Sequence, residues 1–288
     1  MYPAGEAGIT SRHVTLPSAE RVHVVESGPP DGLPVLLCHG WGACVYSWAG
    51  MLPALAAAGY RAIAVDMPGH GRSDAGNEGF GYTVQAMTAR VAAIVETLGI
   101  DRPVIVGHSM SGRIALQYAL DRPDRVRGLA LLAPIGVGSL RPSIKRVGQP
   151  LLAAGVWLGP LAIRRWVVGL VMNAATGRLR RPSPRDVDEY WAPSQWGKYA
   201  RAIHALLRDF DWRALGAATI GSLPMPVVIV LGELDPLVRI ADRQALSEGV
   251  APKRVVTIDG AGHIITDEAT APVNAEVLAL LGLVASRA

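Results

Sequence analysis

Apolar and polar positions along the chain follow two alternating patterns. Short runs rich in Val, Ile and Leu are typical of strands buried on both faces of a sheet, and segments with a helical period lie between them. The predicted strands are Arg12–Leu16, Val22–Glu26, Val35–Cys38, Arg61–Val65, Val104–Val106, Gly128–Leu132, Val227–Leu231 and Val255–Ile258. The predicted helices are Trp48–Ala58, Thr83–Leu98, Ser111–Leu120, Arg239–Gly249 and Thr270–Leu283.

This alternation predicts an α/β fold, a mostly parallel twisted sheet flanked by helices, which opens with an antiparallel hairpin of the first two strands. The alternation of strands and helices is interrupted between about Ile135 and Leu223, where the sequence is helix-like and contains five of the seven tryptophans. We therefore expect a core of residues 1–134 and 223–288, with a helical cap of residues 135–222 inserted after the sixth strand.

The composition is that of a globular protein, with 288 residues, 50% of them hydrophobic and 18% charged, and a net charge of +4. The insert also contains a basic cluster, interspersed with prolines, at Arg178, Arg180, Arg181 and Arg185. We interpret it as a solvated loop of the insert and expect no nucleic-acid partner.

Cofactor and metal sites are not indicated by the sequence. Cys38 and Cys44 are the only cysteines, too few for a disulfide framework or a cysteine metal site, and no spacing of His, Asp and Glu suggests a metal. No glycine-rich phosphate loop follows a strand, so we expect no nucleotide cofactor either.

Targeting and membrane signals are weak. Residues 1–10 lack the basic flank and apolar core of a secretion signal, and the apolar stretch 151–175 is broken by Pro160 and the Arg164-Arg165 pair. That stretch is a poor membrane span. It could instead form an amphipathic lid that contacts lipid or an apolar substrate. We expect a cytoplasmic protein without stable membrane insertion. Homo-oligomerisation is left open.

The stretch Gly107-His108-Ser109-Met110-Ser111-Gly112 places a serine where a predicted strand turns into a predicted helix. This is the pattern of a nucleophile elbow, in which a tight turn exposes the serine hydroxyl. Small residues at such a junction also serve close packing alone. The usual pattern has glycine where this chain has Ser111, which lowers the specificity of the motif.

Two polar residues follow later strands. Asp235 lies in the loop after Val227–Leu231, and His263 lies in the glycine-rich loop after Val255–Ile258. The carboxyl ends of parallel strands gather at one edge of a sheet, so these side chains are expected near Ser109. Their order, Ser then Asp then His, is the order of the α/β-hydrolase triad. Glu233 is close enough to share the role of the acid.

Taken together, these features resemble the α/β-hydrolase fold superfamily over nearly the whole chain. The motifs that carry the resemblance are His39-Gly40-Trp41-Gly42, Asp66-Met67-Pro68-Gly69-His70-Gly71-Arg72-Ser73, the serine elbow, Gly232-x-x-Asp235 and Gly260-Ala261-Gly262-His263. The resemblance implies a catalytic triad of Ser109, His263 and Asp235.

The same resemblance implies an oxyanion hole and several structural roles. The backbone N–H groups of Met110 and Trp41 are expected to stabilise the oxyanion. His39 is expected to order the oxyanion loop rather than to act as a base. His70 and His108 are expected to be structural, and residues 66–73 are expected to form a braced turn.

A serine at position 109 argues against haloalkane dehalogenase and epoxide hydrolase activity, which need a carboxylate nucleophile in this fold. Our leading hypothesis is a serine hydrolase that cleaves an ester, lactone or thioester of a hydrophobic small molecule through an acyl-enzyme on Ser109. Three alternatives stay open: a carbon–carbon bond hydrolase of ring-fission products, a cofactor-independent oxygenase, perhydrolase or rearrangement enzyme, and a ligand-binding receptor.

The hypothesis of a hydrophobic substrate rests on the tryptophans of the insert. We expect the substrate pocket to be lined by Trp41, Trp157, Trp166, Trp191 and Trp196. The alternative interpretation is that the tryptophans of the insert form only its own core.

Overall fold

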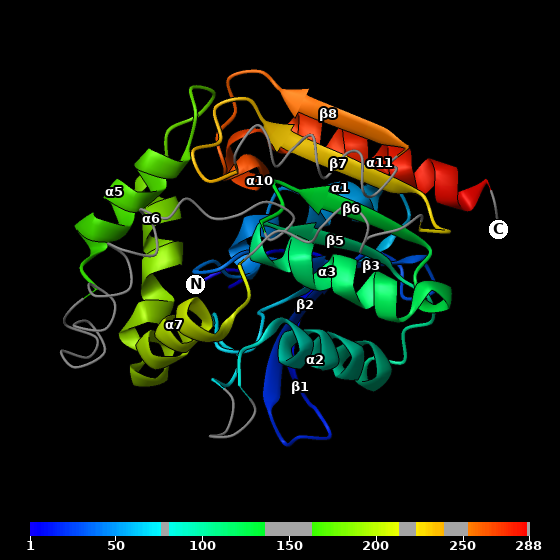
Figure 1. The fold of residues 1–288 in the computed structure, drawn as a ribbon, viewed down its shortest axis with the longest axis horizontal. Helices are drawn as coiled ribbons and strands as arrows, with labels where there is room; N and C mark the ends of the chain where they lie inside the picture. Colours follow the sequence, from blue (N-terminus) through cyan, green and yellow to red (C-terminus); the bar gives the residue numbers. More distant parts are fainter. Residues whose placement is uncertain (76–80, 136–162, 213–222, 239–252, 287–288) are drawn as a thin grey trace.

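A computed structural model describes residues 1–75, 81–135, 163–212, 223–238 and 253–286. Its eight strands form one sheet in the order β1-β2-β4-β3-β5-β6-β7-β8 (Figure 1). The strands are β1 (Ile9–Thr15), β2 (Arg21–Ser27), β3 (Pro34–Cys38), β4 (Arg61–Val65), β5 (Val104–His108), β6 (Gly128–Leu132), β7 (Val227–Gly232) and β8 (Arg254–Ile258).

The sheet is mostly parallel, as predicted. β1 pairs with β2 in an antiparallel hairpin, and β2 pairs antiparallel with β4. Every other neighbouring pair, from β4–β3 to β7–β8, is parallel. The carboxyl ends of β3 and of β5 to β8 therefore lie along one edge of the sheet, which is where open α/β sheets place their ligands.

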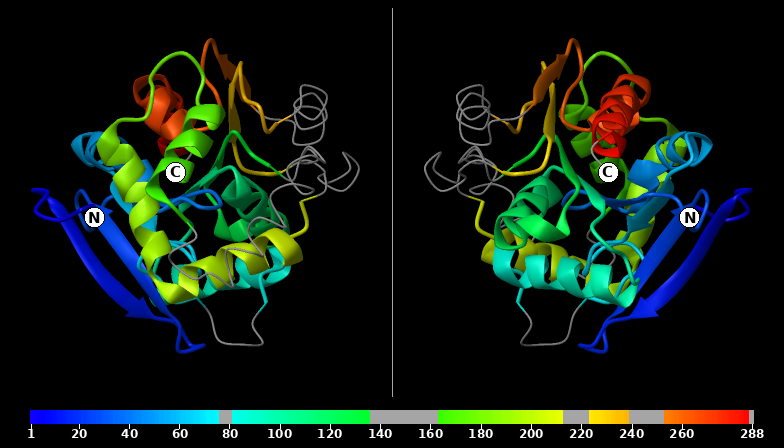
Figure 2. Two further views of the ribbon diagram at one scale, coloured as in Figure 1. Left: turned by 90° about the vertical axis from the view of Figure 1, so that its left-hand side faces the viewer. Right: turned by 90° about the vertical axis from the view of Figure 1, so that its right-hand side faces the viewer.

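Helices cover both faces of the sheet. The helices α2 (Val84–Thr97) and α3 (Met110–Asp121) cover one face, and α1 (Leu52–Ala57) and α11 (Thr270–Ala285) cover the other (Figure 2). Successive strand residues enter opposite cores, so Ile105 packs beneath α3 while its neighbours Val104 and Val106 pack on the other side. Burial on both faces explains the continuous apolar runs.

Two elements differ from the sequence prediction by more than two residues at one end. The apolar pattern starts β1 at Arg12, but the ladder begins at Ile9, because Ile9 pairs with Ser27 regardless of side-chain polarity. The single helix predicted over Trp48–Ala58 is divided into a 3₁₀ turn, η1 (Val45–Trp48), and α1. α1 begins at Leu52 because Pro53 lacks an N–H and fits only the first turn of a helix. The helix predicted at Arg239–Gly249 lies outside the described residues.

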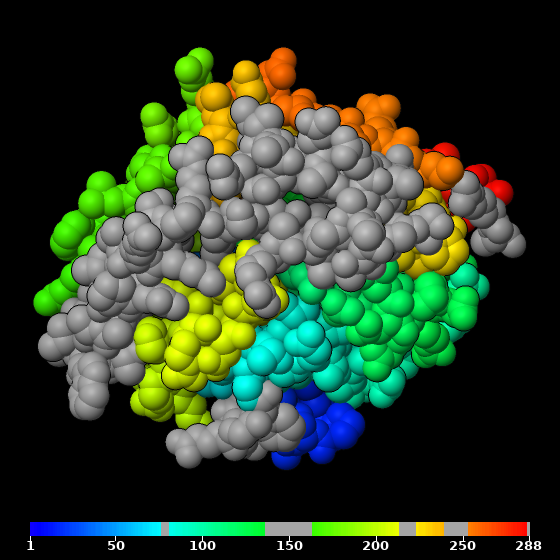
Figure 3. Space-filling view, viewed as in Figure 1, coloured from blue at the N-terminus to red at the C-terminus, as the bar shows by residue number. Residues whose placement is uncertain are grey.

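The described part of the insert is helical. It contains α5 (Arg165–Ala175), α6 (Pro184–Trp191), the 3₁₀ turn η4 (Ala192–Gln195) and α7 (Gly197–Asp209). These helices gather at one end of the molecule, where α5 and α7 form part of the outer surface (Figure 3). The cap boundaries at 135 and 222 stay a prediction. We use the word cap below for residues 163–212.

Two further features of the described chain bear on the sequence analysis. Cys38 and Cys44 are both free and buried. Among the helices of the described ranges, none has the length and apolar character needed to cross a bilayer.

Candidate active site

Ser109 lies at the junction between β5 and α3, in a backbone conformation that few residues adopt. Its φ of 53° and ψ of −118° are strained for a residue with a Cβ atom. The turn is tight, because a Cβ added at Gly107 would lie 2.5 Å from the carbonyl oxygen of Ser111 and one at Gly112 would lie 2.7 Å from Cβ of Pro134. The two glycines thus permit the turn that projects the Ser109 hydroxyl beyond the strand.

The structure brings together the three side chains of the predicted triad. The Nε2 atom of His263 lies 2.8 Å from Oγ of Ser109, and its Nδ1 atom lies 2.8 Å from Oδ2 of Asp235. All three residues are buried. A carboxylate at Nδ1 favours the tautomer whose proton is on Nδ1, leaving the Nε2 lone pair for the serine proton.

Asp235, rather than Glu233, is the carboxylate that contacts the imidazole. Its other oxygen, Oδ1, accepts hydrogen bonds from the backbone N–H groups of Leu237 (2.7 Å) and Val238 (3.0 Å). Burial would raise the pKa of Asp235, but His263 and these N–H groups lower it below its ordinary value. Glu233 instead points outward and accepts from the N–H of Gly260 at 2.8 Å.

The two expected oxyanion donors belong to two segments that lie next to Ser109. Met110 is the first residue of α3, so its N–H is one of the amides for which a helix provides no acceptor. In the second segment, Gly40 is so close that an added Cβ would lie 2.9 Å from Cβ of Ser109. Trp41 follows Gly40, so its N–H belongs to the loop that faces the serine.

A hydrogen bond of its hydroxyl group explains how Ser111 is accommodated where glycine is usual. Its hydroxyl donates to the carbonyl oxygen of His39 at 2.5 Å. The elbow is thereby tied directly to the loop that contains His39 and Gly40. The sequence raised the question but could not answer it, because the partner lies 72 residues earlier.

His39 contacts the backbone of the loop that contains Gly40, where it was expected to order the chain. Its Nδ1 is 2.8 Å from the carbonyl oxygen of Gly40, and its Nε2 accepts from the N–H of Met67 at 3.0 Å. Burial lowers the pKa of His39, with Asp66 opposing the shift. A neutral ring that donates from Nδ1 and accepts at Nε2 fits both contacts.

His108 and His70 are buried and neutral. The pKa of each is lowered to about 3, mainly by burial, with a smaller contribution from the neighbouring His263 for His108 and from His39 for His70. His108 Nε2 lies 2.9 Å from the carbonyl oxygen of His263. Since a carbonyl only accepts, His108 carries its proton on Nε2 and holds the backbone of His263 in place.

The turn at residues 66–73 is braced by Asp66. Its carboxylate accepts from the N–H groups of Val45 (2.8 Å) and Arg72 (2.9 Å) and contacts His23 Nδ1 at 2.7 Å. The Nε2 atom of His23 is in turn 2.8 Å from Oγ of Ser11, so a second Ser–His–Asp chain exists in this protein.

The tryptophans expected in the substrate pocket occupy different surroundings. Trp41 donates through Nε1 to the carbonyl oxygen of Ile203 in α7, and Trp191 donates to that of Ile163. Trp166 is 66% exposed on α5, and Trp196 is 42% exposed beside a surface groove of about 250 Å³. These contacts do not bring Trp166 or Trp196 to Ser109. Trp157 lies outside the described residues, and the pocket assignment stays a prediction.

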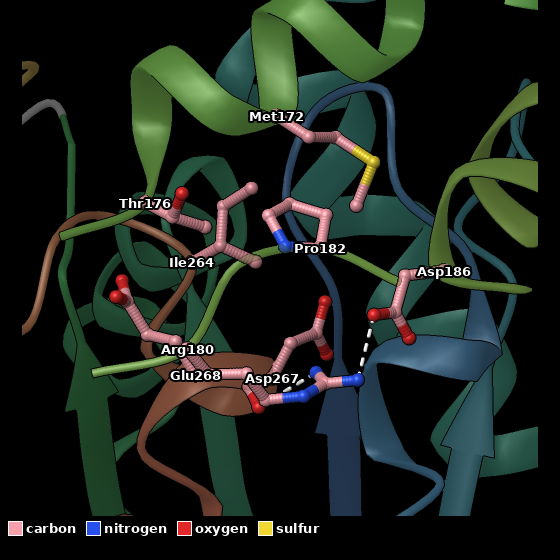
Figure 4. Close-up of a pocket in the computed structure, with 8 residues that line it drawn as sticks. All are labelled: Met172, Thr176, Arg180, Pro182, Asp186, Ile264, Asp267 and Glu268. Carbon is pink, nitrogen blue, oxygen red and sulfur yellow. Dashed lines mark hydrogen bonds and ion pairs between the residues drawn. The ribbon is translucent and has the colours of Figure 1, made fainter. Parts of the chain in front are cut away.

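A polar cluster joins the cap to α10 (Ile265–Glu268) around a small cavity of about 10 Å³ (Figure 4). Arg180 pairs with Asp186 at 2.6 Å, and the hydroxyl of Tyr190 donates to Asp267 at 2.6 Å. Burial raises the pKa of Asp267 to about 7, with Asp186 adding to the shift and the Tyr190 hydrogen bond opposing it. Sequence reasoning missed this cluster, since no motif marks it.

No group of three or more His, Cys, Asp or Glu side chains in the described ranges is arranged to hold a metal ion.

Comparisons with known proteins agree with this fold. Residues 34–153 match a family model described as alpha/beta hydrolase fold. Epoxide hydrolase A of Mycobacterium tuberculosis is 27% identical over 302 residues, covering 91% of this chain and 94% of that protein.

Solved structures share the fold. Carboxylesterase CesB from Bacillus subtilis superposes with a TM-score of 0.80 at 20% identity, covering 96% of this chain and 92% of that chain. The 2-hydroxy-6-oxo-6-phenylhexa-2,4-dienoate hydrolase of Rhodococcus sp. strain RHA1 gives a TM-score of 0.78 at 20% identity, covering 95% of this chain and 99% of that one.

Proposed function

Because this chain belongs to the α/β-hydrolase fold superfamily, we propose that it is a serine hydrolase that cleaves an ester, lactone or thioester of a hydrophobic small molecule through an acyl-enzyme on Ser109. The relative and neighbours named above are hydrolases, which supports the reaction class. The observation that carries the proposal is the 2.8 Å contact of Ser109 Oγ with His263 Nε2, backed by Asp235 at 2.8 Å.

In the proposed reaction, Ser109 Oγ attacks the acyl carbon while its proton passes to Nε2 of His263. Asp235 stabilises the imidazolium that forms, and the N–H groups of Met110 and Trp41 bind the developing oxyanion. His263 then protonates the leaving group as the bond to it breaks. A water molecule, deprotonated by the same histidine, hydrolyses the acyl-enzyme and restores Ser109.

Epoxide opening is the competing reaction suggested by the Mycobacterium tuberculosis relative. In this fold that reaction requires a carboxylate nucleophile at the elbow, where this chain has a serine. A serine attack on an epoxide would leave an ether that His263 cannot hydrolyse by the same route. The identity of the nucleophile thus favours acyl transfer.

The hydrophobic substrate is proposed from the character of the surroundings. The indole of Trp41 extends from the oxyanion loop to α7 of the cap, and Tyr199 of α7 donates to the carbonyl oxygen of Gly42 at 3.2 Å. Aromatic side chains therefore connect the proposed oxyanion hole to the cap. Such surfaces favour apolar ligands with few polar groups.

The decisive experiment is labelling with a fluorophosphonate, followed by mapping of the modified residue. We expect modification of Ser109 and its loss in Ser109→Ala, while the matched variant Ser11→Ala labels like the wild type. Aryl esters of increasing chain length should then be hydrolysed, with Ser109→Ala lowering kcat at least about 10³-fold.

Three results would contradict the proposal. Labelling of a residue other than Ser109 would show that the elbow serine is not activated. Turnover that survives in Ser109→Ala would favour a cofactor-independent reaction instead. Tight binding of apolar ligands without any turnover would favour the receptor alternative.

A further inference from the structure

The segment that leaves cap helix α5 lies against the loop that carries His263. The N–H of His263 donates to the carbonyl oxygen of Ala175 at 2.7 Å, and the N–H of Arg178 donates to that of Gly260 at 2.7 Å. The two bonds pair the segments 175–178 and 260–263 in opposite chain directions. The cap and the loop are therefore joined as two short antiparallel stretches of backbone.

Glu268, the last residue of α10, bonds to both stretches. Its Oε2 atom accepts from the N–H of Gly177 at 2.7 Å, and its Oε1 atom accepts from the N–H of Gly262 at 2.7 Å. The side chain is buried. Hydrogen bonds from amides to an ionised carboxylate are stronger than neutral ones, so this single group ties the cap to the loop before His263.

Glycines allow the two stretches to approach this closely. A Cβ added at Gly177 would lie 2.6 Å from the nitrogen of Gly262, and one at Gly262 would lie 2.5 Å from the carbonyl oxygen of Ala175. On the core side, a Cβ at Gly232 would lie 2.7 Å from the carbonyl oxygen of Ala261. Gly262 is thus packed between the cap and the end of β7 with no room for a side chain on any of the three glycines.

The backbone of His263 is held at both of its polar groups. Its N–H is bonded to Ala175 of the cap, while its carbonyl oxygen is 2.9 Å from Nε2 of His108 in β5. The ring is held separately by Asp235. The cap therefore supplies one of the few contacts that fix where the imidazole lies.

We propose that residues 175–178, residues 260–263 and Glu268 form a cap–histidine clasp, in which Glu268 is a positioning residue that sets the place of His263. The proposal rests on the proposed function, since it assigns a purpose to the position of the imidazole. It also means that the cap, which would contact substrate, fixes the base at the same time. Misplacement of a reacting group by about 1 Å can cost about 100-fold in rate.

The test compares Glu268→Ala, which removes both acceptors, with Glu268→Gln, which keeps one carbonyl oxygen. Glu276→Ala is the matched control, because it removes a half-buried carboxylate of α11 that pairs with the exposed Arg254 and contacts neither stretch of the clasp. Gly177→Ala and its control Gly197→Ala probe the close approach, since an added Cβ at Gly197 meets no atom within 4 Å.

Hydrolysis of p-nitrophenyl butyrate should be measured per active site, with sites counted by fluorophosphonate titration. We expect Glu268→Ala and Gly177→Ala to lower kcat per site by about 10-fold to 100-fold while KM changes less than about 2-fold. Glu268→Gln should fall between Glu268→Ala and the wild type. Both control variants should keep the wild-type rate. A purely structural role would reduce the number of titrated sites and leave the rate of each site unchanged.

A second readout does not depend on activity. The proton shared by His263 Nδ1 and Asp235 should give a low-field proton resonance, which we expect to shift or vanish in Glu268→Ala and to persist in Glu276→Ala. If the wild type neither labels nor hydrolyses esters but this resonance still responds to Glu268, the clasp stands and the proposed function fails. An unchanged resonance together with an unchanged rate per site would overturn the clasp.

Discussion

At the scale of single residues, the protein contains two Ser–His–Asp chains with nearly the same distances. Ser11, His23 and Asp66 are joined at 2.8 and 2.7 Å, and Ser109, His263 and Asp235 at 2.8 and 2.8 Å. The surroundings differ. Ser11 is an exposed residue in a regular strand, whereas Ser109 occupies a strained turn at the start of a helix, facing the Gly40 loop. Hydrogen-bond distances alone do not make a nucleophile, because the oxyanion also needs donors.

Replacing Asp235 by Asn should separate the two carboxylates that the sequence offered as the acid. An amide at this position would donate to Nδ1 and favour the wrong imidazole tautomer, so Asp235→Asn should lower kcat by about 10⁴-fold. Glu233→Gln should change kcat little, because Glu233 bonds Gly260 on the outside. Steady-state rates on one aryl ester measure both, and equal losses in the two variants would contradict the assignment.

Ser111→Ala should weaken the link between the elbow and the oxyanion loop. The carbonyl oxygen of His39 would lose its bond from the Ser111 hydroxyl, at a cost of about 1 kcal/mol in the free energy of unfolding. The loop would also hold Trp41 less firmly, so kcat should fall several-fold with KM nearly unchanged. Urea denaturation and ester kinetics measure the two effects. Wild-type values in both would show that the link is dispensable.

At the scale of elements, the sequence was most informative about strands buried on both faces. β4 (Arg61–Val65) and β6 (Gly128–Leu132) match their predicted bounds, because the apolar run in each covers the residues that pair within the sheet. The mostly parallel sheet and the opening hairpin were also predicted. Helix α10 was not, because four residues show no periodicity.

The candidate site was predictable only in part, because local sequence patterns do not report contacts between distant segments. Ser109, Asp235 and His263 each follow a strand, so local pattern placed them at one edge of the sheet. The clasp joins Gly177 to Glu268, 91 residues apart, and neither residue belongs to a local motif. Contacts that depend on how the cap meets the core leave no trace in the periodicity of either segment.

The contact between α6 and α10 should make stability depend on pH. Burial raises the pKa of Asp267 from its ordinary value of 3.8 to about 7, so between these values the folded protein binds a proton that the unfolded chain does not. The contribution of Asp267 to the free energy of unfolding therefore decreases as pH rises through this window.

Asp267→Asn should remove this dependence, since the amide oxygen still accepts from Tyr190 and cannot titrate. Relative to the variant, the wild type should lose at least about 1 kcal/mol between about pH 5 and about pH 8. Urea unfolding at several pH values measures the difference, with the exposed Asp259→Asn as control. Parallel pH curves for the wild type and Asp267→Asn would contradict it.

At the scale of the whole molecule, the two cores on either side of the sheet carry the stability. Trp48 is fully buried in the core beneath α1 and α11, whereas Trp166 is exposed on α5. Trp48→Ala should lower the free energy of unfolding by about 3–5 kcal/mol. Trp166→Ala should change it by less than about 0.5 kcal/mol. Urea denaturation of both variants tests the contrast, and similar losses would contradict it.

Burial of the two cysteines protects their thiols from chemical modification in the folded protein. Burial raises the pKa of Cys38 to about 12 and holds that of Cys44 well above its ordinary value, so neither presents a thiolate to solvent while the sheet is intact. Alkylating reagents act on thiolates, and so they can modify this chain only when the interior opens. The rate of thiol alkylation therefore measures how often the structure around β3 opens, and it requires no attached probe.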